Sequence, residues 1–199
     1  MERNVTTVSL DLESPDHLKL LNAQWRFGSG WIPGEPNEGL VAQTIESPAL
    51  LADYDDSDWE VLSDVVPATE DPAVGNEDAP GIRKARSIGL TFGWYRMRIT
   101  LPERVGDMDV AGSKVWFETM VDDYGEVWVD AVPLIWEEQF TKGRPGVVTG
   151  IRVPTRTIVT EDARPGAEHV ISVLAINGPL GRPGGAIYLL YARLAFERG

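Results

Sequence analysis

The sequence predicts an all-β protein, an antiparallel β-sandwich of the jelly-roll type, and three observations carry this prediction. Aromatic and β-branched residues crowd the segments 93–105 and 113–134, and turn-forming residues lie between the runs. Within 114–121 the odd-numbered residues, which are apolar apart from Thr119, share one face of a strand, and the even-numbered residues share the other. Three further strand-like runs follow at spacings typical of a sandwich, at 147–160, 169–176 and 186–197.

The front of the chain is less regular. Residues 1–20 alternate weakly and predict a first strand or an ordered arm, whereas residues 22–51 are rich in Trp, Pro and Gly and have no helical period. We therefore expect one sandwich domain over residues 1–199, with residues 1–50 as an N-terminal extension packed on it. Residues 67–89 are polar and rich in turn formers, which predicts a long loop. Helix content should be low.

Composition and charge exclude several classes of protein. The chain of 199 residues has no cysteine, so a disulfide framework and a thiolate metal site are both excluded. Its formal charge of −13 repels phosphate backbones and anionic bilayers, which argues against nucleic acid and membranes as partners. The amino terminus has no signal-peptide h-region, and no apolar run reaches the length of a membrane span. These features predict a cytoplasmic protein.

Four motifs in a fixed order are similar to those of a known family. They are DDSDW at 55–59, GWYRMRITLPE at 93–103, VDDYGEVWVD at 121–130 and EHVISVLAIN at 168–177. This order resembles the sugar-binding jelly-roll domain of glycoside hydrolase family 2, one of the galactose-binding-domain-like β-sandwiches. The last third of the chain also resembles the jelly-roll modules attached to gluconolactonase-like propellers. The resemblance covers residues 50–197 and implies a fold, whereas an activity does not follow from it.

The chain departs from the family pattern at one turn. After the run VWV, where the family usually has Gly or Asn, the sequence has Asp130 and Ala131. We therefore expect a turn of a different shape there. The sequence also predicts that residues 121–130 belong to a hairpin whose tip is acidic.

Aromatic residues and one arginine are the leading candidates for ligand binding. Aromatic rings stack on the apolar faces of sugars, and they also fill protein cores. Trp116 and Trp128 lie within strand alternation, which favours packing, whereas loop tryptophans favour a ligand platform. Arg96 fits two roles equally, a clamp for a carboxylate or hydroxyl pair and an ion pair that anchors a sheet edge. The predicted ligand-binding residues are Trp31, Trp94, Tyr95, Arg96, Tyr124, Trp136, Arg152 and Asn177.

The densest carboxylate cluster contains Asp53, Asp55 and Asp56. Closely spaced carboxylate oxygens are suitable ligands for calcium, so these residues are the candidates for a metal site. The alternative is a solvated turn in which the Asp side chains accept backbone N–H groups. No cofactor is required by the sequence, and structural calcium is the cofactor that it leaves open.

Three functions remain open at this stage. The first is a non-catalytic module that binds a carbohydrate or a similar polyhydroxylated small molecule by aromatic stacking and polar contacts. The second is a small-molecule cyclase or hydrolase on the same sandwich, with Asp122, Asp123 or Glu118 as a carboxylic acid in an aromatic pocket. The third is an accessory subunit, which pairs with a separate catalytic subunit or with a second copy of itself. The sequence does not decide whether the protein is an enzyme.

Overall fold

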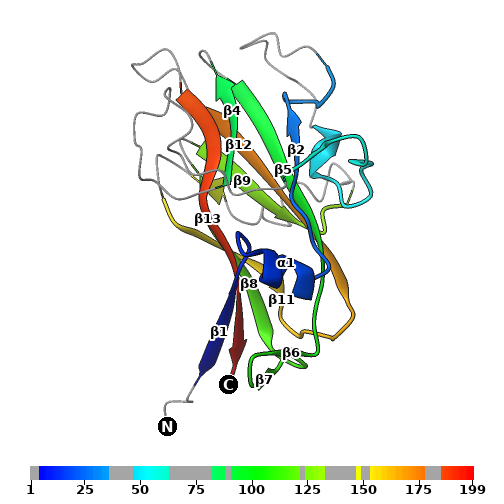
Figure 1. The fold of residues 1–199 in the computed structure, drawn as a ribbon, viewed down its shortest axis with the longest axis vertical. Coiled ribbons are helices and arrows are strands. Elements are labelled where there is room, and N and C mark those ends of the chain that lie inside the picture. Colours follow the sequence, from blue (N-terminus) through cyan, green and yellow to red (C-terminus); the bar gives the residue numbers. More distant parts are fainter. Residues whose placement is uncertain are drawn as a thin grey trace, which may run out of the picture.

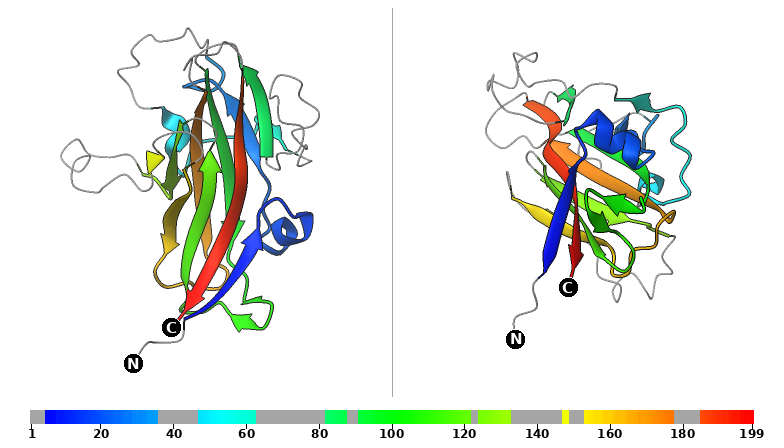
Figure 2. Two further views of the ribbon diagram at one scale, coloured as in Figure 1. Left: turned by 90° about the vertical axis from the view of Figure 1, so that its left-hand side faces the viewer. Right: turned by 60° about the horizontal axis from the view of Figure 1, so that its bottom comes forward.

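The computed structural model shows an antiparallel β-sandwich, as the sequence predicted (Figure 1). The residues that it describes are 5–35, 47–62, 82–87, 91–121, 124–132, 147–148, 153–177 and 185–199. Two sheets pack face to face, and the views in Figure 2 show the two layers from other sides. The helical segments of the described ranges are short: α1 (Pro15–Leu20) and the 3-10 turn η1 (Pro48–Leu50).

One layer is a five-stranded sheet in which the C-terminal strand has most of the partners. It contains β1 (Thr6–Asp11), β4 (Ile82–Ser87), β8 (Lys114–Val121), β11 (Thr155–Thr160) and β13 (Gly185–Arg198). The strand order is β1-β13-β8-β11, and β4 also pairs with β13. Strand β13 is 14 residues long. It has β4 alongside its first half and β1 alongside its second half.

The other layer is a six-stranded sheet of order β10-β9-β12-β5-β2-β3. Its strands are β2 (Arg26–Ser29), β3 (Glu60–Val61), β5 (Thr91–Thr100), β9 (Tyr124–Val129), β10 (Val147–Val148) and β12 (Glu168–Asn177). The ten-residue strands β5 and β12 pair over their whole length and form its centre. A separate two-stranded ribbon, β6 (Arg104–Val105) and β7 (Met108–Asp109), lies at the end of the molecule where both termini lie (Figure 1).

The main core lies between the two sheets and follows the period of two. Strand β8 has the burial pattern that the sequence predicted, because Val115, Phe117, Thr119 and Val121 are all buried. Alternate residues of β5, β12 and β13 meet them from both layers. The core includes Tyr95, Met97, Ile99, Ile171, Val173, Leu194 and Phe196.

Three details differ from the sequence predictions. Strands β1 and β2 are members of the two sheets, so these parts of the predicted N-terminal extension belong to the sandwich itself. Residues 82–87, expected within a long loop, form strand β4. The hairpin prediction for 121–130 is wrong, because β8 belongs to the five-stranded sheet and β9 to the six-stranded sheet.

Gly125 is required where the chain crosses between the sheets. A Cβ atom at this position would lie 2.6 Å from the carbonyl oxygen of Leu174 and 2.9 Å from a methyl group of Val121. The crossing strand therefore approaches its neighbours more closely than any side chain allows. A turn within one sheet and a crossing to the facing sheet use the same turn residues, so the sequence did not distinguish them.

Candidate functional site

The outer face of the six-stranded sheet, which points away from the core, is covered by the segment 47–62. Along β5 the outward residues Trp94 and Arg96 are buried, and Arg98 is exposed. A second hydrophobic cluster forms between this face and the covering segment. Its buried members are Ala49, Leu50, Trp59, Trp94, Trp128 and Leu174. The covering segment therefore has an apolar core of its own.

Arg96 fixes the covering segment to the sheet. Its side chain is fully buried, and its Nε donates to Oδ2 of Asp56 at 2.8 Å. Its Nη1 donates to the carbonyl oxygens of Ala49 and Leu51 at 2.6 and 2.9 Å, and to the Ser172 hydroxyl at 2.7 Å. Burial lowers the pKa of the guanidinium from its ordinary value, and the Asp56 carboxylate opposes that shift. Arg96 therefore has the anchoring role, and its prediction as a ligand-binding residue is wrong.

Arg26 holds the same turn from the neighbouring strand. Its Nη1 donates to the carbonyl oxygens of Asp56, Ser57 and Trp59 at 3.0 to 3.2 Å. The ring of Trp59 lies directly on β2, since a Cβ atom at Gly28 would meet that ring at 2.6 Å. The turn 55–59 is thus fixed by two arginines and one tryptophan, which makes it a rigid wall for whatever lies beside it.

Two aromatic residues that the sequence assigned to ligand binding are buried. Trp94 is 1% exposed, and its Nε1 donates to the carbonyl oxygen of Trp31 at 3.0 Å. Tyr95 faces the main core, where its hydroxyl donates to the carbonyl oxygen of Ile187 at 2.8 Å. Neither ring presents a face to a ligand, so both assignments are wrong. Trp31 is half-buried and packs edge-on against Phe92, with ring centroids 5.5 Å apart.

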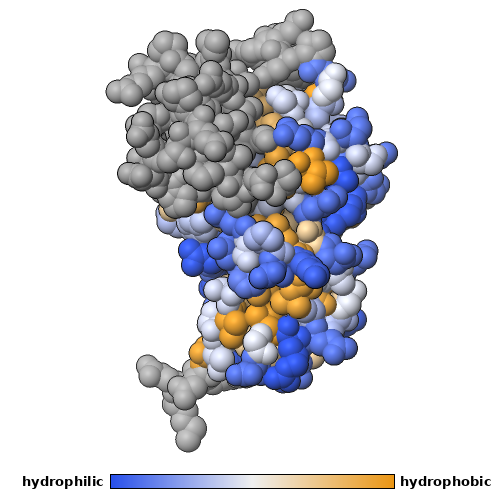
Figure 3. All heavy atoms as spheres, in the orientation of Figure 1, coloured by the Kyte–Doolittle hydropathy of each residue, from blue (hydrophilic) through white to orange (hydrophobic). Residues whose placement is uncertain are grey.

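Beside the covering segment lies an open groove with a volume of about 990 Å³. Its walls are the turn 52–57 and the end of α1 with residues 22–26, and its floor is the end of β5 and the start of β12. Figure 3 shows mostly hydrophilic residues along the right-hand edge of the molecule, where the segment 51–58 lies in Figure 1. The polar side chains that line the groove are Lys19, Asn22, Gln24, Arg26, Asp53, Tyr54, Asp55, Asp56, Ser57, Arg98, Thr100, Asp130, Glu168 and His169. We refer to it as the polar groove.

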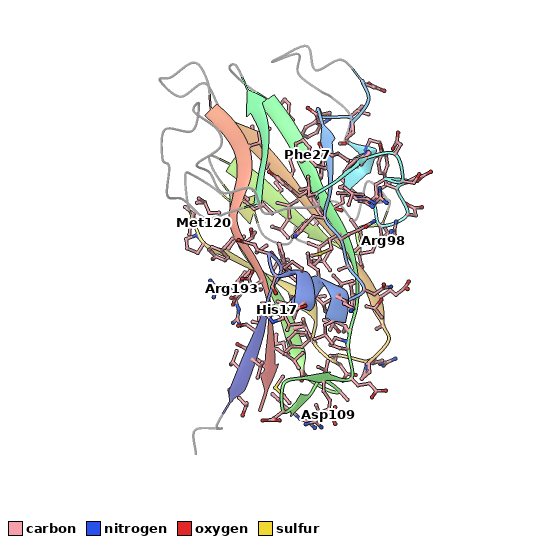
Figure 4. The ribbon with its side chains drawn as sticks, viewed as in Figure 1. His17, Phe27, Arg98, Asp109, Met120 and Arg193 are labelled. Atoms are coloured by element: carbon pink, nitrogen blue, oxygen red, sulfur yellow. The ribbon has the colours of Figure 1, made fainter. Side chains whose placement is uncertain are left out.

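The polar groove carries charges of both signs. Arg98 lies on its floor beside the turn 52–57 (Figure 4), where its Nη2 donates to the carbonyl oxygens of Ala52 and Tyr54. Hydrogen bonds from Ser57 lower the pKa of the Asp55 carboxyl, so this group is ionised at neutral pH. Within the described ranges Lys19, Asp53 and Glu168 line the groove without a side-chain hydrogen bond or ion pair.

One end of the groove is formed by a paired histidine and aspartate. Nδ1 of His169 lies 2.6 Å from Oδ2 of Asp130, and Oδ1 of Asp130 accepts the backbone N–H of Val170 at 2.7 Å. Asp130 has a φ of +48°, the left-handed region that Gly and Asn favour. The expectation that the turn differs in shape from that of the family stays a prediction. The carboxylate fixes the orientation of the imidazole.

The aspartates predicted to bind calcium are near one another, but two of the three have other partners. Asp56 accepts from Arg96, and Asp55 accepts the backbone N–H of Ser57 at 3.0 Å. Asp53 is exposed on the same wall. No group of three or more metal-ligating side chains occurs among the residues that the structure describes. The arrangement of Asp55 is the solvated turn that was the alternative prediction.

Among the other predicted residues, Glu118 does not line the groove. Glu118 lies on the outer face of the five-stranded sheet, where its carboxylate accepts from Nε of Arg156 at 2.9 Å. The prediction that it serves as an acid in an aromatic pocket is therefore wrong. Tyr124 and Asn177 are placed in β9 and β12, and their side chains are outside the described part. Asp122, Asp123, Trp136 and Arg152 lie outside the described residues.

Several residues of the groove were missed by sequence reasoning. Arg98 had a usable signal, because it lies two residues after Arg96 on one strand and so shares its face. Lys19 and Glu168 had none, since they come from α1 and β12 and meet only through the topology. His169 and Asp130 are 39 residues apart in the sequence, and nothing in either motif pairs them.

Together the fold and the groove define a jelly-roll β-sandwich with an open polar site on the outer face of one sheet. None of the helical segments in the described ranges has the length and apolar character needed to span a bilayer. No protein-family model matches the sequence, and no curated protein matches it. The comparison with solved structures is informative.

The fold is similar to a part of several glycoside hydrolase family 2 enzymes. A β-glucuronidase from Bacteroides uniformis matches 96% of this chain with a TM-score of 0.54 and 16% identity, over 18% of its own length. A glycoside hydrolase family 2 member from Bacteroides cellulosilyticus matches 96% with a TM-score of 0.53 and 16% identity, over 21% of its length. A Faecalibacterium prausnitzii β-glucuronidase matches 99% with a TM-score of 0.50 and 15% identity, over 32% of its length. The chain thus spans no more than a third of these proteins.

Proposed function

We propose that the protein binds a carbohydrate or a similar polyhydroxylated small molecule in the polar groove. The observation that carries this proposal is the lining of the groove, where side chains of both charges surround a volume of about 990 Å³. Each sugar hydroxyl both donates and accepts hydrogen bonds, so a polyol needs acceptors and donors within reach. Asp53 and Glu168 supply acceptors, and Lys19 and Arg98 supply donors.

The mechanism differs in one respect from the aromatic stacking that the sequence suggested. Trp94 and Tyr95 are buried, and of the Phe, Trp and Tyr residues that the structure describes, Tyr54 lines the groove. Its ring is held against Trp59, with centroids 5.5 Å apart, and the Arg96 guanidinium lies 5.5 Å from it. A sugar in the groove would therefore be held mainly by charged hydrogen-bonding groups, with Tyr54 as the apolar contact.

The enzyme alternative has less support. Trp31, Trp94 and Trp128 do come together with Glu126 on the outer face of the six-stranded sheet, as an aromatic pocket with an acid requires. The space between them is about 30 Å³, which is room for one or two water molecules. A metabolite of sugar size fits the polar groove and not this space. A role as an accessory subunit is compatible with binding in the groove.

Isothermal titration across a panel of neutral sugars, sugar acids and amino sugars tests the proposal. We expect saturable binding to at least one of them, and about tenfold weaker binding in the variants Arg98→Gln and Asp53→Asn, because each loses a charged hydrogen bond. Arg193→Gln and Glu103→Gln are matched controls, since both residues are exposed and neither lines the groove. The absence of saturable heat for every sugar at millimolar concentration overturns the proposal, as does an equal loss in the control variants.

A further inference from the structure

A second hollow adjoins the polar groove. It has a volume of about 340 Å³ and is formed mainly by the connection between β11 and β12. Its lining residues are Thr160, Glu161, Asp162, Arg164, Ala167 and His169. His169 also lines the polar groove, so the two hollows meet at this side chain. Both volumes are in the range of small-molecule binding sites.

His169 is held in one orientation at this junction. Its side chain is 15% exposed, and Oδ2 of Asp130 lies 2.6 Å from its Nδ1. Because an ionised carboxylate only accepts hydrogen bonds, the neutral imidazole carries its proton on Nδ1. Its Nε2 is then an acceptor, and no hydrogen bond to it occurs within the described ranges. The junction thus presents an imidazole nitrogen of fixed orientation that can form a hydrogen bond with a hydroxyl group.

The second hollow has polar groups that can adapt to a ligand. The Arg164 side chain is 83% exposed, and its Nε lies 3.9 Å from Oδ2 of Asp162, which is the limit for an ion pair. Such an exposed pair contributes little to stability, so Arg164 can turn toward a ligand at small cost. Glu161, whose carboxylate is 70% exposed and pairs with Lys114, adds acceptor oxygens on the same connection. The hollow therefore repeats, on a smaller scale, the mixed charges of the polar groove.

We infer that the groove and the second hollow form one continuous site for an oligosaccharide, with His169 contacting the chain where it passes from one to the other. This inference rests on the proposed function and specifies its ligand as a chain of sugar units. A single sugar would occupy only the groove. A longer chain gains contacts with Arg164 and its neighbours, and each 1.4 kcal/mol gained tightens binding about tenfold.

The test is the dependence of affinity on chain length. Mono-, di- and tetrasaccharides of the cello-, xylo-, manno- and galacto- series are titrated into the wild-type protein and into Arg164→Ala and His169→Gln. We expect a tetrasaccharide to bind about tenfold more tightly than the disaccharide of the same series. Arg164→Ala should remove most of this gain and leave the disaccharide affinity unchanged. His169→Gln should weaken the tetrasaccharide more than the disaccharide.

Controls separate this inference from the proposed function. Arg193→Ala removes another exposed arginine, with 47% of its side chain exposed, on the outer face of the five-stranded sheet, on the side of the molecule away from Arg98 (Figure 4), and should change neither affinity. If some sugar binds but tetra- and disaccharides bind equally, the extended site is refuted while the groove proposal stands. If Arg164→Ala weakens both lengths equally, the extended site is likewise refuted. If no sugar of any length binds, both proposals fail.

Discussion

The outer faces of the two sheets carry the same sequence pattern, a tryptophan followed by a charged residue, but differ in how deeply these residues are buried. On β5 a tryptophan, Trp94, is followed at the next outward position by a charged residue, Arg96. On β8 Trp116 is followed in the same way by Glu118. The six-stranded sheet is covered there by the segment 47–62, so Trp94 and Arg96 are buried. The face of the five-stranded sheet leaves Trp116 and Glu118 only half-buried.

The polar and aromatic side chains of the two faces have different kinds of partners. The indole Nε1 of Trp116 donates to Glu197 at 2.8 Å, and the Arg156 guanidinium lies 4.2 Å from its ring. Arg156 also pairs with Glu118 and Glu197, in a network that reaches across β11, β8 and β13. Water can replace any one of these contacts. Arg96 and Asp56 have no such replacement, so the comparison predicts unequal costs for similar substitutions.

The largest expected effect is that of Arg96→Ala. It removes four short hydrogen bonds and leaves the nearly buried Asp56 carboxylate with a longer ion pair, to Arg26 Nε at 3.9 Å, which should cost about 3–5 kcal/mol of unfolding free energy. Urea denaturation measures the loss, and limited proteolysis should show cleavage within 47–62. Arg98→Ala, on the same face of the same strand, is the matched control and should cost about 1 kcal/mol or less. Equal losses in the two variants would show that the covering segment is held by other contacts.

A pair of tryptophan substitutions sharpens the comparison. Trp59→Ala empties the apolar cluster beneath the covering segment and should cost about 3–5 kcal/mol. Trp116→Ala removes a ring of equal size from the open face, and there we expect roughly 1 kcal/mol, because water already reaches that ring. Thermal unfolding by circular dichroism gives both values. The reverse order would mean that the open face is covered in solution, as the accessory-subunit hypothesis requires.

The smallest effect should follow Arg156→Ala, with a loss of about 1 kcal/mol or less that shrinks in high salt. Hydrogen bonding to Arg156 lowers the pKa of Glu197 below its ordinary value of 4.5. A carboxyl with a lowered folded-state pKa stabilises the protein above its ordinary pKa, and this contribution disappears as the pH falls through the folded pKa. The difference in unfolding free energy between wild type and variant should therefore be largest near neutral pH and should disappear on acidification. A gap that is constant down to pH about 3 would exclude this ion pair as its cause.

Local pattern was sufficient for the fold and insufficient for the site. The alternation of β8 and the order of the four motifs predicted a jelly roll, because side-chain period and turn chemistry are properties of neighbouring residues. The aromatic residues of the WYR motif were expected at a ligand, yet Trp94 is covered and Tyr95 faces the core. The sequence of β5 alone does not predict which segment packs on its outer face. That depends on a segment more than 30 residues earlier in the chain.

The residues of the polar groove could not be predicted from local sequence pattern either. Lys19, Arg98 and Glu168 come from three separate elements, and their meeting depends on strand order in the sheet. The acidic turn was recognised, but its strongest feature, the pairing of Asp56 with Arg96 across 40 residues, has no local signature. Arg96 was left between two roles for that reason, and burial is what decides between them.

The long strand β13 has a consequence for how the chain folds during synthesis. Strands β1, β4 and β8 all pair with residues 185–198, so the five-stranded sheet has no centre until those residues have left the ribosome. Until then β1 has no strand to pair with, because its partner lies more than 170 residues later in the sequence. Such distant pairing makes β-proteins fold slowly. The nascent chain would expose the apolar faces of β1 and β8 throughout this interval. Chaperone contacts with a stalled nascent chain should therefore persist until β13 emerges.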